Sequence, residues 1–165
     1  RNATRFPLDM FHFGDDWGQQ RGLLMGPERW RRFIKPRLAR MYGAAKRAGC
    51  YVFIHSCGDV DELFPDLIEI GLDVLHPIQK YTMDERQIAT RYGKDLCIWA
   101  GFDVQRVIPY GTPEEVRQEV RFLIDTYARP EGRFMLTAGN AITPDCPVES
   151  LCALLDEAYT YGTNK

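Results

Sequence analysis

Short apolar runs alternate with longer amphipathic segments along the chain. Four runs, near residues 51–54, 72–75, 96–100 and 134–138, each follow a helical pattern that ends in glycine. The runs are continuous and do not alternate with polar residues, which is typical of strands buried on both faces of a parallel sheet. A fifth run, at Pro7–Gly14, comes first. The pattern predicts five strands, each followed by a helix, in an α/β fold.

The glycines before the four runs are predicted to end the preceding helices. They are Gly49, Gly71, Gly93 and Gly132. Glycine commonly takes the left-handed conformation just after a helix, because it has no Cβ that would clash there. We therefore expect a positive φ at all four positions.

The clearest helical pattern is the segment TPEEVRQEVRFLIDTYA, residues 112–128. Thr112 is predicted to cap the first turn, with Pro113 at the first helical position and Glu115 completing a capping box. Apolar residues at helical spacing form one stripe: Val116, Val120, Leu123, Ile124 and Tyr127.

Proline marks two further helical regions. A final helix is expected to begin at the CPVESL segment, with Pro147 at its start. The longer region 26–49 contains Pro36, which has no N–H to donate, so a break or kink is expected near Lys35.

Composition places the chain among ordinary globular proteins. It has 165 residues, 45% hydrophobic and 27% charged, with a net charge of −2. This is enough chain for one core, and we predict a single domain over residues 1–165. The near-neutral charge favours neither nucleic acid nor an anionic membrane as partner, and no apolar run is long enough to span a bilayer. Five cysteines, an odd number, favour a reducing cytoplasm over a disulfide framework.

Polar residues follow each predicted strand. The carboxyl ends of parallel strands share one edge of a sheet, and active sites of barrels and open α/β sheets lie there. We therefore take the polar residues at these ends as candidates for catalysis or substrate binding: Asp15, Asp16, Trp17, His55, Cys57, His76, Gln79, Asp103, Gln105, Arg106 and Asn140.

His55 and Cys57 are the strongest candidates for metal binding. Side chains at i and i+2 of a strand point the same way, so an imidazole nitrogen and a sulfur can face one point. The alternative is a hydrogen-bonded core histidine beside an inert buried thiol. Cys146, at the start of the final helix, is a further cysteine where a thiolate would be favoured. Cys50, Cys97 and Cys152 occupy apolar positions and are predicted to be core residues.

Four segments resemble the C-terminal half of the uroporphyrinogen decarboxylase superfamily. They are DDWGQQRGLLMGPERWRRFIKPRL, HSCGDVDELFPDLIEIGLDVLHPIQ, AGFDVQRVIPYGTPEEVRQEV and GNAITPDCPVESLCALLDEA. The superfamily includes the decarboxylase and the zinc-dependent corrinoid:thiol methyltransferases. The resemblance implies a (β/α)8 TIM barrel of which this chain supplies the last five βα units. The first three units, the missing N-terminal part, would belong to a longer polypeptide.

The resemblance also implies a metal site. The methyltransferases have a His-x-Cys pair that is similar to His55 and Cys57, and both would bind zinc. Their third ligand is a cysteine in a turn that reads Gly139-Asn140-Ala141-Ile142 here, where decarboxylases carry a histidine. The chain departs from both patterns, so Asn140 and Cys146 are the two candidates for a third ligand.

Three functions remain open at this stage. In the methyltransferase-like one, zinc activates a substrate thiol that accepts a methyl group, for example from a corrinoid carried by a corrinoid protein; Asp16 or Asp103 would orient a ligand or replace one. In the decarboxylase-like one, a pocket carboxylate holds pyrrole N–H groups and Arg21 or Arg106 meets the substrate's acidic side chains. The third is a non-catalytic, divergent barrel. Asp16, Asp103 and His76 are assigned to catalysis, and Asp15, Trp17, Gln79, Gln105, Arg106 and Asn140 to binding a small-molecule substrate.

Overall fold

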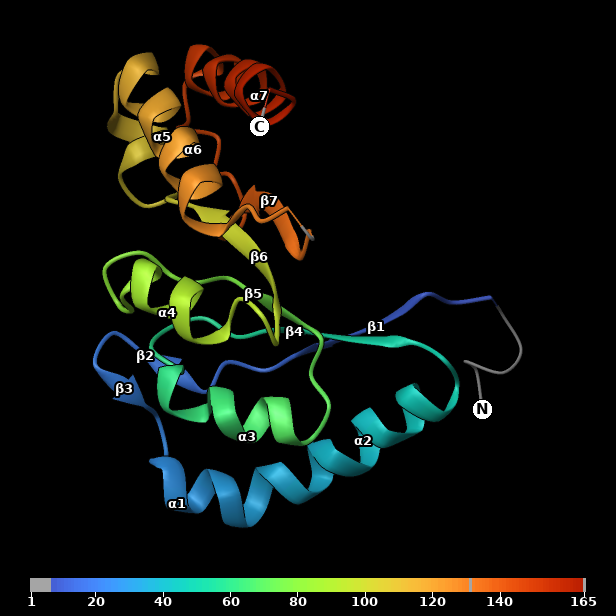
Figure 1. Cartoon of the computed structure of the whole chain (residues 1–165). Helices are drawn as coiled ribbons and strands as arrows, with labels where there is room; N and C mark the ends of the chain where they lie inside the picture. The colour runs from blue at the N-terminus through green and yellow to red at the C-terminus, as the bar shows by residue number, and fades with distance from the viewer. Residues whose placement is uncertain (1–6, 131, 165) are drawn as a thin grey trace.

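The computed structural model describes residues 7–130 and 132–164. Five parallel strands form one sheet in the order β1-β4-β5-β6-β7, as the sequence pattern predicts. Helices α2 and α3 lie below β1 and β4, and α5, α6 and α7 lie above β6 and β7, so the sheet curves with its helices outside (Figure 1). The strands are β1 Met10–Gly14, β4 Tyr51–His55, β5 Val74–His76, β6 Cys97–Phe102 and β7 Phe134–Ala138.

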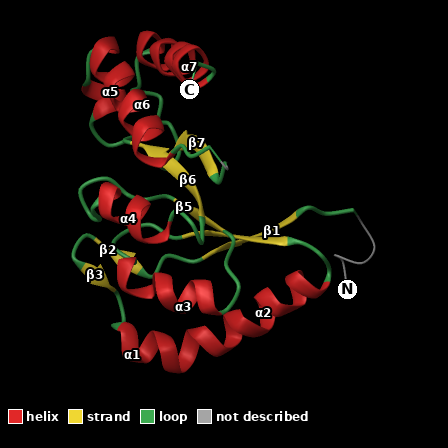
Figure 2. Cartoon of the chain, in the orientation of Figure 1, coloured by secondary structure: helices red, strands yellow, loops and turns green. Residues whose placement is uncertain are grey.

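At least one helix follows each of the five strands, which confirms the predicted alternation (Figure 2). A short antiparallel hairpin, β2 Gly18–Gln19 and β3 Gly22–Leu23, precedes the first helix and was not predicted. The helices are α1 Pro27–Arg29, the π-helix η1 Trp30–Ile34, α2 Lys35–Arg47, the 3-10 helix η2 Asp61–Leu63, α3 Phe64–Glu69, α4 Glu85–Tyr92, α5 Val107–Tyr110, α6 Pro113–Tyr127 and α7 Val148–Gly162.

The first strand begins at Met10, three residues later than predicted. Met10 pairs with Tyr51, the first residue of β4, so residues before Met10 extend past the partner strand. The Asp9 carbonyl still accepts a hydrogen bond from the Tyr51 N–H, and pairing ends there. The length of the neighbouring strand therefore sets this boundary.

Gly49 and Gly71 directly follow the C-cap residues of α2 and α3, as predicted, whereas Gly132 lies beyond Ala128, the C-cap residue of α6, and does not cap that helix. Gly49, Gly71 and Gly132 have φ values of 78°, 100° and 80°. Gly93 is the C-cap residue of α4, as predicted, but its φ is −65°, so the expected positive φ is wrong there. A Cβ on Gly93 would lie 2.6 Å from the Arg129 guanidinium, and the absence of a side chain there makes room for that residue.

Pro36 does not break the helical region. A π turn over η1 precedes α2, and the N–H of Lys35 donates to the carbonyl of Trp30, five residues back. The wider turn lets the helix continue through a residue that has no N–H. Pro147 caps the final helix, which begins at Val148.

Helix α6 agrees with its sequence pattern. Thr112 and Glu115 form a reciprocal capping box, and Pro113 is the first helical residue. Every residue of the predicted apolar stripe is buried. Pairing of the two orphan backbone donors and burial of the stripe therefore stabilise the same helix.

The two faces of the sheet differ in burial. On the helix side, Val52 and Ile54 of β4 are fully buried, whereas Tyr51 on the opposite face is 60% exposed. This opposite, inner face carries aromatic side chains: the Phe53 ring lies 4.6 Å from that of His12 and 4.7 Å from that of Trp99. Strands β1 and β7 are the two edges of the sheet. Within the described residues, none of the helices combines the length and apolar character needed to cross a membrane.

Candidate functional site

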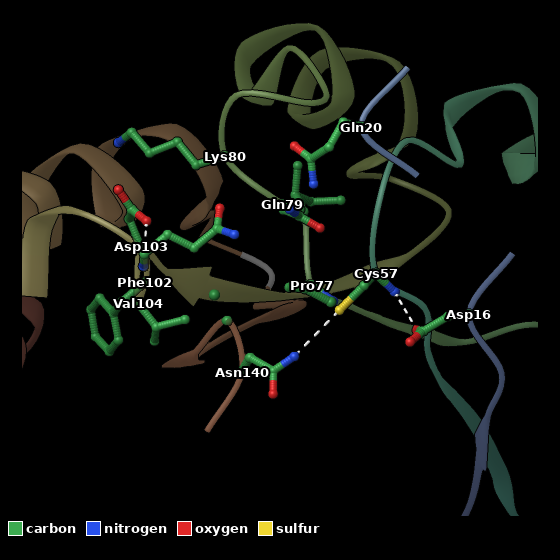
Figure 3. Close-up of a pocket in the computed structure, with 14 residues that line it drawn as sticks. Asp16, Gln20, Cys57, Pro77, Gln79, Lys80, Phe102, Asp103, Val104 and Asn140 are labelled. Carbon is green, nitrogen blue, oxygen red and sulfur yellow. Dashed lines mark hydrogen bonds between the residues drawn. The ribbon is translucent and has the colours of Figure 1, made fainter. Parts of the chain in front are cut away.

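A cavity of about 340 Å3 opens at the carboxyl ends of the strands, the edge at which the polar residues were expected. Cys57, Asp16 and Asn140 line one end of it, and Asp103 and Lys80 line the other (Figure 3). Five loops far apart in the sequence therefore contribute to one concave site, which is the usual arrangement in α/β proteins.

Asp16, His55 and Cys57 form a group that could hold a metal ion. One ligand atom from each residue lies within 4.8 Å of the other two. The Cys57 Sγ lies 3.3 Å from the His55 Nε2, and that nitrogen lies 3.8 Å from the Asp16 Oδ1. Cys57 comes after the end of β4 rather than within the strand, yet the two side chains converge as the i and i+2 spacing predicted.

Close backbone contact between two loops brings Asp16 to this group. A Cβ on Gly18 would lie 2.6 Å from the Cys57 carbonyl oxygen, and one on Gly58, whose φ is 81°, would lie 2.3 Å from the Gly18 carbonyl carbon. Only glycine permits both approaches. The Cys57 N–H also donates to Asp16 Oδ1 at 2.7 Å, which fixes the carboxylate beside the thiol.

His76 holds the His55 ring from the adjacent strand. The two Nδ1 atoms lie 2.8 Å apart, and His76 Nε2 lies 3.0 Å from the Ala138 carbonyl oxygen. A carbonyl only accepts, so His76 Nε2 carries the proton. Burial lowers the pKa of His76 and favours its neutral form, although the hydrogen bond to Ala138 acts in the opposite direction. Neutral His76 then accepts from His55 Nδ1–H, which leaves the His55 Nε2 lone pair facing Cys57.

The surroundings of the Cys57 thiol shift its pKa in opposite directions. Burial raises its pKa, and the Asp16 carboxylate raises that pKa further. Asn140 acts the other way, because its Nδ2 donates to the Cys57 sulfur at 3.5 Å. The Asn140 Oδ1 accepts from the Ala141 N–H at 2.7 Å. The amide therefore presents its donor, and not its oxygen, to the sulfur.

Cys146, the other candidate for a third ligand, lies elsewhere. It is 8% exposed and belongs to the hydrophobic core. Among the described residues, the metal-compatible group contains Asp16 in addition to His55 and Cys57, and it does not contain Cys146.

The predicted residues of the fourth strand end stabilise their own loop. Asp103 is 5% exposed, and Oδ1 accepts from the N–H groups of Gln105 and Arg106. Oδ2 accepts from the Tyr81 hydroxyl and from a third backbone N–H. The Arg106 guanidinium stacks on the Tyr81 ring at 4.3 Å and does not line the cavity. Gln105 lines the cavity and is available to a ligand.

Asp15 and Trp17 lie apart from the cavity. Trp17 is 2% exposed and packs edge-on against Trp30. Its indole Nε1–H donates to Asp15 Oδ2 at 2.9 Å, which satisfies the one polar atom of the buried ring. Both residues therefore support the core beneath the first loop.

Gln79 lines the cavity as predicted, and its Oε1 accepts from the Gly58 N–H at 2.7 Å. Two polar side chains of the cavity were missed, Gln20 and Lys80. Lys80 follows Gln79 directly in the sequence, and this position next to a predicted site residue is the signal by which it could have been found. Its ammonium pairs with the buried carboxylate of Glu119.

Comparison with known proteins places these features in context. A family model described as Uroporphyrinogen decarboxylase (URO-D) matches residues 11–161. A methylated-thiol–coenzyme M methyltransferase from Methanosarcina mazei is 32% identical over 130 residues, which are 79% of this chain and 32% of that protein. A uroporphyrinogen decarboxylase from Anaeromyxobacter sp. is 28% identical over 130 residues, 79% of this chain and 36% of that protein.

The fold has a solved counterpart. The structure of a methyltransferase from Methanosarcina mazei covers 93% of this chain with a TM-score of 0.72 at 19% sequence identity, and the match spans 42% of that structure. At this identity the likeness shows the fold, which is the partial TIM-barrel arrangement expected from the sequence. The chain spans about a third of the length of the curated relatives it matches.

Proposed function

Since the chain belongs to the uroporphyrinogen decarboxylase family, we propose that it forms the metal-binding part of a methyltransferase-type active site. The observation that carries the proposal is the convergence of Asp16, His55 and Cys57 within 4.8 Å. One carboxylate, one imidazole and one thiol are all donors that zinc accepts, and three protein ligands leave one position for a substrate.

The residues present fit zinc in three respects. The His55 Nε2 lone pair faces the group, because His76 accepts from the other ring nitrogen. Burial and the neighbouring Asp16 carboxylate raise the pKa of the Cys57 thiol. The positive charge of a bound cation would offset both effects. The mixed set of oxygen, nitrogen and sulfur donors suits zinc better than magnesium or calcium.

Zinc in this position supplies the positive charge that keeps a substrate thiol in its nucleophilic thiolate form at neutral pH. Asp16 takes the third ligand position that the sequence left to Asn140 or Cys146. Asn140 donates to the Cys57 sulfur, and this hydrogen bond would stabilise a thiolate there. Gln79 and Gln105 line the cavity and can orient the substrate by hydrogen bonds.

The substrate class is a small thiol, and the methyl donor is a corrinoid presented by a partner protein. A cavity of about 340 Å3 suits a small molecule. The M. mazei relative is a methylated-thiol–coenzyme M methyltransferase by name, which supports a thiol substrate. Three further βα units would complete the barrel and the substrate site. The five free cysteines favour a cytoplasmic, reducing location.

A decarboxylase activity is the second candidate, supported by the family match and the Anaeromyxobacter relative. The part of the cavity lining that this chain supplies does not favour it. A substrate with several carboxylates calls for arginines, and none of the described residues that line the cavity is an arginine. The one lysine among them, Lys80, is paired with Glu119. A non-catalytic barrel, the third candidate, predicts no metal binding at all.

Cobalt substitution tests the proposal. The chain is loaded with Co2+, and 2-mercaptoethanol is added while thiolate-to-cobalt charge-transfer absorption is recorded. The proposal predicts that this absorption increases with thiol, that ethylene glycol leaves it unchanged, and that His55→Ala abolishes the response. If the thiol changes nothing in Co2+-loaded protein, the group does not bind thiol substrates and the methyltransferase-type assignment fails.

A further inference from the structure

Three successive backbone N–H groups hold the loop that carries Cys57. The N–H of Cys57 donates to Asp16 Oδ1 at 2.7 Å, and that of Gly58 donates to Gln79 Oε1 at 2.7 Å. The next N–H, of Asp59, donates to a backbone carbonyl of β2 at 2.9 Å. Groups that are far from this loop in the sequence therefore fix its conformation.

The Gly58 N–H needs an acceptor because of where the loop places it. Gly58 is buried, and its φ of 81° takes the chain out of the line of β4. Its backbone also packs closely on another loop, since a Cβ on Gly58 would lie 2.3 Å from the Gly18 carbonyl carbon. A buried N–H without an acceptor destabilises a fold, and the Gln79 side chain supplies that acceptor.

This hydrogen bond determines the orientation of the Gln79 side-chain amide. A backbone N–H only donates, so the atom that faces Gly58 is the amide oxygen, and the remaining polar atom, Nε2, is a donor. The backbone of Gln79 is fixed as well, because its carbonyl oxygen accepts from the N–H and the hydroxyl of Thr82, at 3.2 and 2.8 Å. The amide therefore has one anchored end and one end that is left to donate.

The free end of the amide belongs to the cavity. Gln79 lines the cavity together with Cys57 and is only half-buried (Figure 3). Within residues 7–130 and 132–164, Nε2 has no hydrogen-bond partner. Because Gly58 directly follows Cys57, this donor lies beside the metal-compatible group, where a substituent of a bound thiol would meet it.

The other amides of the cavity differ in how firmly they are oriented. Asn140 resembles Gln79, since its oxygen accepts from the next backbone N–H and its nitrogen donates to the Cys57 sulfur. Gln20 and Gln105 also line the cavity, and neither side-chain amide has a hydrogen-bond partner among the described residues. These two can turn either end toward a ligand, whereas Gln79 can present only its donor.

We propose that Gln79 both positions Cys57 and selects the thiol, an inference that rests on the proposed function. Its Oε1 holds the Cys57 loop through the Gly58 N–H, and its Nε2–H donates to an oxygen acceptor of the substrate. The substrate class is a thiol with an oxygen acceptor a few bonds from the sulfur, and a purely apolar thiol binds less well. Gln79 is thus a positioning residue through its oxygen and a specificity-determining residue through its nitrogen.

Two substitutions separate these roles in the 165-residue chain. Gln79→Glu keeps an acceptor for Gly58 and removes the donor, whereas Gln79→Leu removes both. Gln118→Glu, at an exposed position of α6, is the matched control for the added charge. Circular dichroism establishes that all three variants are folded.

Hydrogen exchange of the Gly58 amide, resolved by fragmentation in mass spectrometry on metal-free protein, tests the positioning role. Exchange in Gln79→Leu is expected to be at least about fivefold faster than in wild type, as for the loss of one hydrogen bond. Gln79→Glu and Gln118→Glu should exchange as wild type does. A wild-type rate in Gln79→Leu would overturn the positioning role.

Thiol titrations of Co2+-loaded protein test the specificity role. Methyl thioglycolate has an ester carbonyl that only accepts hydrogen bonds, and 1-butanethiol is its apolar counterpart. The preference of wild type for the ester should fall at least about fivefold in Gln79→Glu and stay unchanged in Gln118→Glu. An unchanged preference in Gln79→Glu would overturn the specificity role. If neither thiol changes the cobalt spectrum of wild type, the proposed function and the specificity role fail together, while the exchange measurement still decides the positioning role.

Discussion

His55 and His76 face each other across two neighbouring strands, with their Nδ1 atoms 2.8 Å apart. The Ala138 carbonyl on β7 accepts from the far side of His76. A hydrogen-bonded chain therefore runs from β7 through β5 to β4 and ends at the lone pair of His55 Nε2. A group that hydrogen-bonds to the second ring nitrogen of a metal-binding histidine fixes the orientation of the ring, and proteins commonly adjust metal affinity in this way.

Loss of His76 is therefore expected to weaken metal binding although His76 is not a ligand. His76→Leu removes the acceptor for His55 Nδ1–H and should lower zinc affinity by about 10- to 100-fold. His76→Gln keeps an acceptor and a donor and should lose far less. Competition against a chromogenic chelator measures both variants, and urea unfolding serves as the control for stability. Equal losses in the two variants would mean that His76 acts only through packing.

Asn140 provides a second test, because it lies where methyltransferases are expected to have a cysteine ligand. Replacing its amide by a thiolate adds charge and a softer donor next to Cys57. Asn140→Cys should tighten zinc binding by at least about tenfold, which is about 1.4 kcal/mol. Cys146→Ser should leave the affinity unchanged, because Cys146 lies in the core. An unchanged affinity in Asn140→Cys together with a loss in Cys146→Ser would identify Cys146 as the third ligand.

The strands and the position of the site were predictable because both follow from short-range patterns. Apolar runs of limited length fixed the five strands, and parallel pairing brings the residues after them to one edge. The hairpin of β2 and β3 was missed, since two residues per strand carry no periodicity. Gly93 was misjudged, because its reason for being glycine is a tertiary contact with Arg129.

The roles of individual site residues depended on contacts that a sequence does not reveal. Trp17 lies in a polar segment of the sequence, yet its ring is buried. Asp15 makes this possible because it accepts a hydrogen bond from the indole N–H. Asp103 resembles a catalytic carboxylate in sequence, whereas three backbone N–H groups occupy its oxygens. Asp16 joins the metal-compatible group through contact between the Gly18 and Gly58 backbones.

Glu85 is expected to make stability fall as pH rises. Its Oε1 is buried without a hydrogen-bond partner among the described residues, and burial raises the pKa of Glu85 to about 7. Because the folded-state pKa lies above the unfolded value, the contribution is fully present below the unfolded pKa and is lost as pH rises through about 7. His76, with its lowered pKa, acts in the opposite direction, so the effect of Glu85 must be isolated by mutation.

Urea unfolding of wild type and Glu85→Gln at about pH 5 and about pH 8 isolates this effect. Wild type should lose about 1–2 kcal/mol more than the variant over this range, a value discounted for the partial exposure of Glu85. Identical pH dependence in the two proteins would show that the carboxyl is ionised throughout.

The sheet edges predict the behaviour of the chain in solution. Within the part of the chain that the structure describes, strands β1 and β7 have neighbours on one side only, and the inner face carries the partly exposed rings of Phe53 and Trp99. Unpaired edges and apolar faces promote association, so the 165-residue chain should be oligomeric in light scattering. Co-expression with the three βα units of a relative's barrel should restore a defined species. A monodisperse monomer with sharp, cooperative unfolding would argue against a partial barrel.

Zinc binding by the 165-residue chain tests the central claim most directly. A competition titration against a chromogenic chelator, with total zinc measured after dialysis, is performed on wild type, Cys57→Ala and the control Cys152→Ala. Cys152 was predicted to be a core residue, but it is exposed and lies outside the group, so its loss should not matter. The account predicts about one zinc per chain in wild type and in the control, and a reduction of at least about 100-fold in affinity for Cys57→Ala. Absence of zinc from wild type, or an affinity that Cys57→Ala leaves unchanged, would contradict the account.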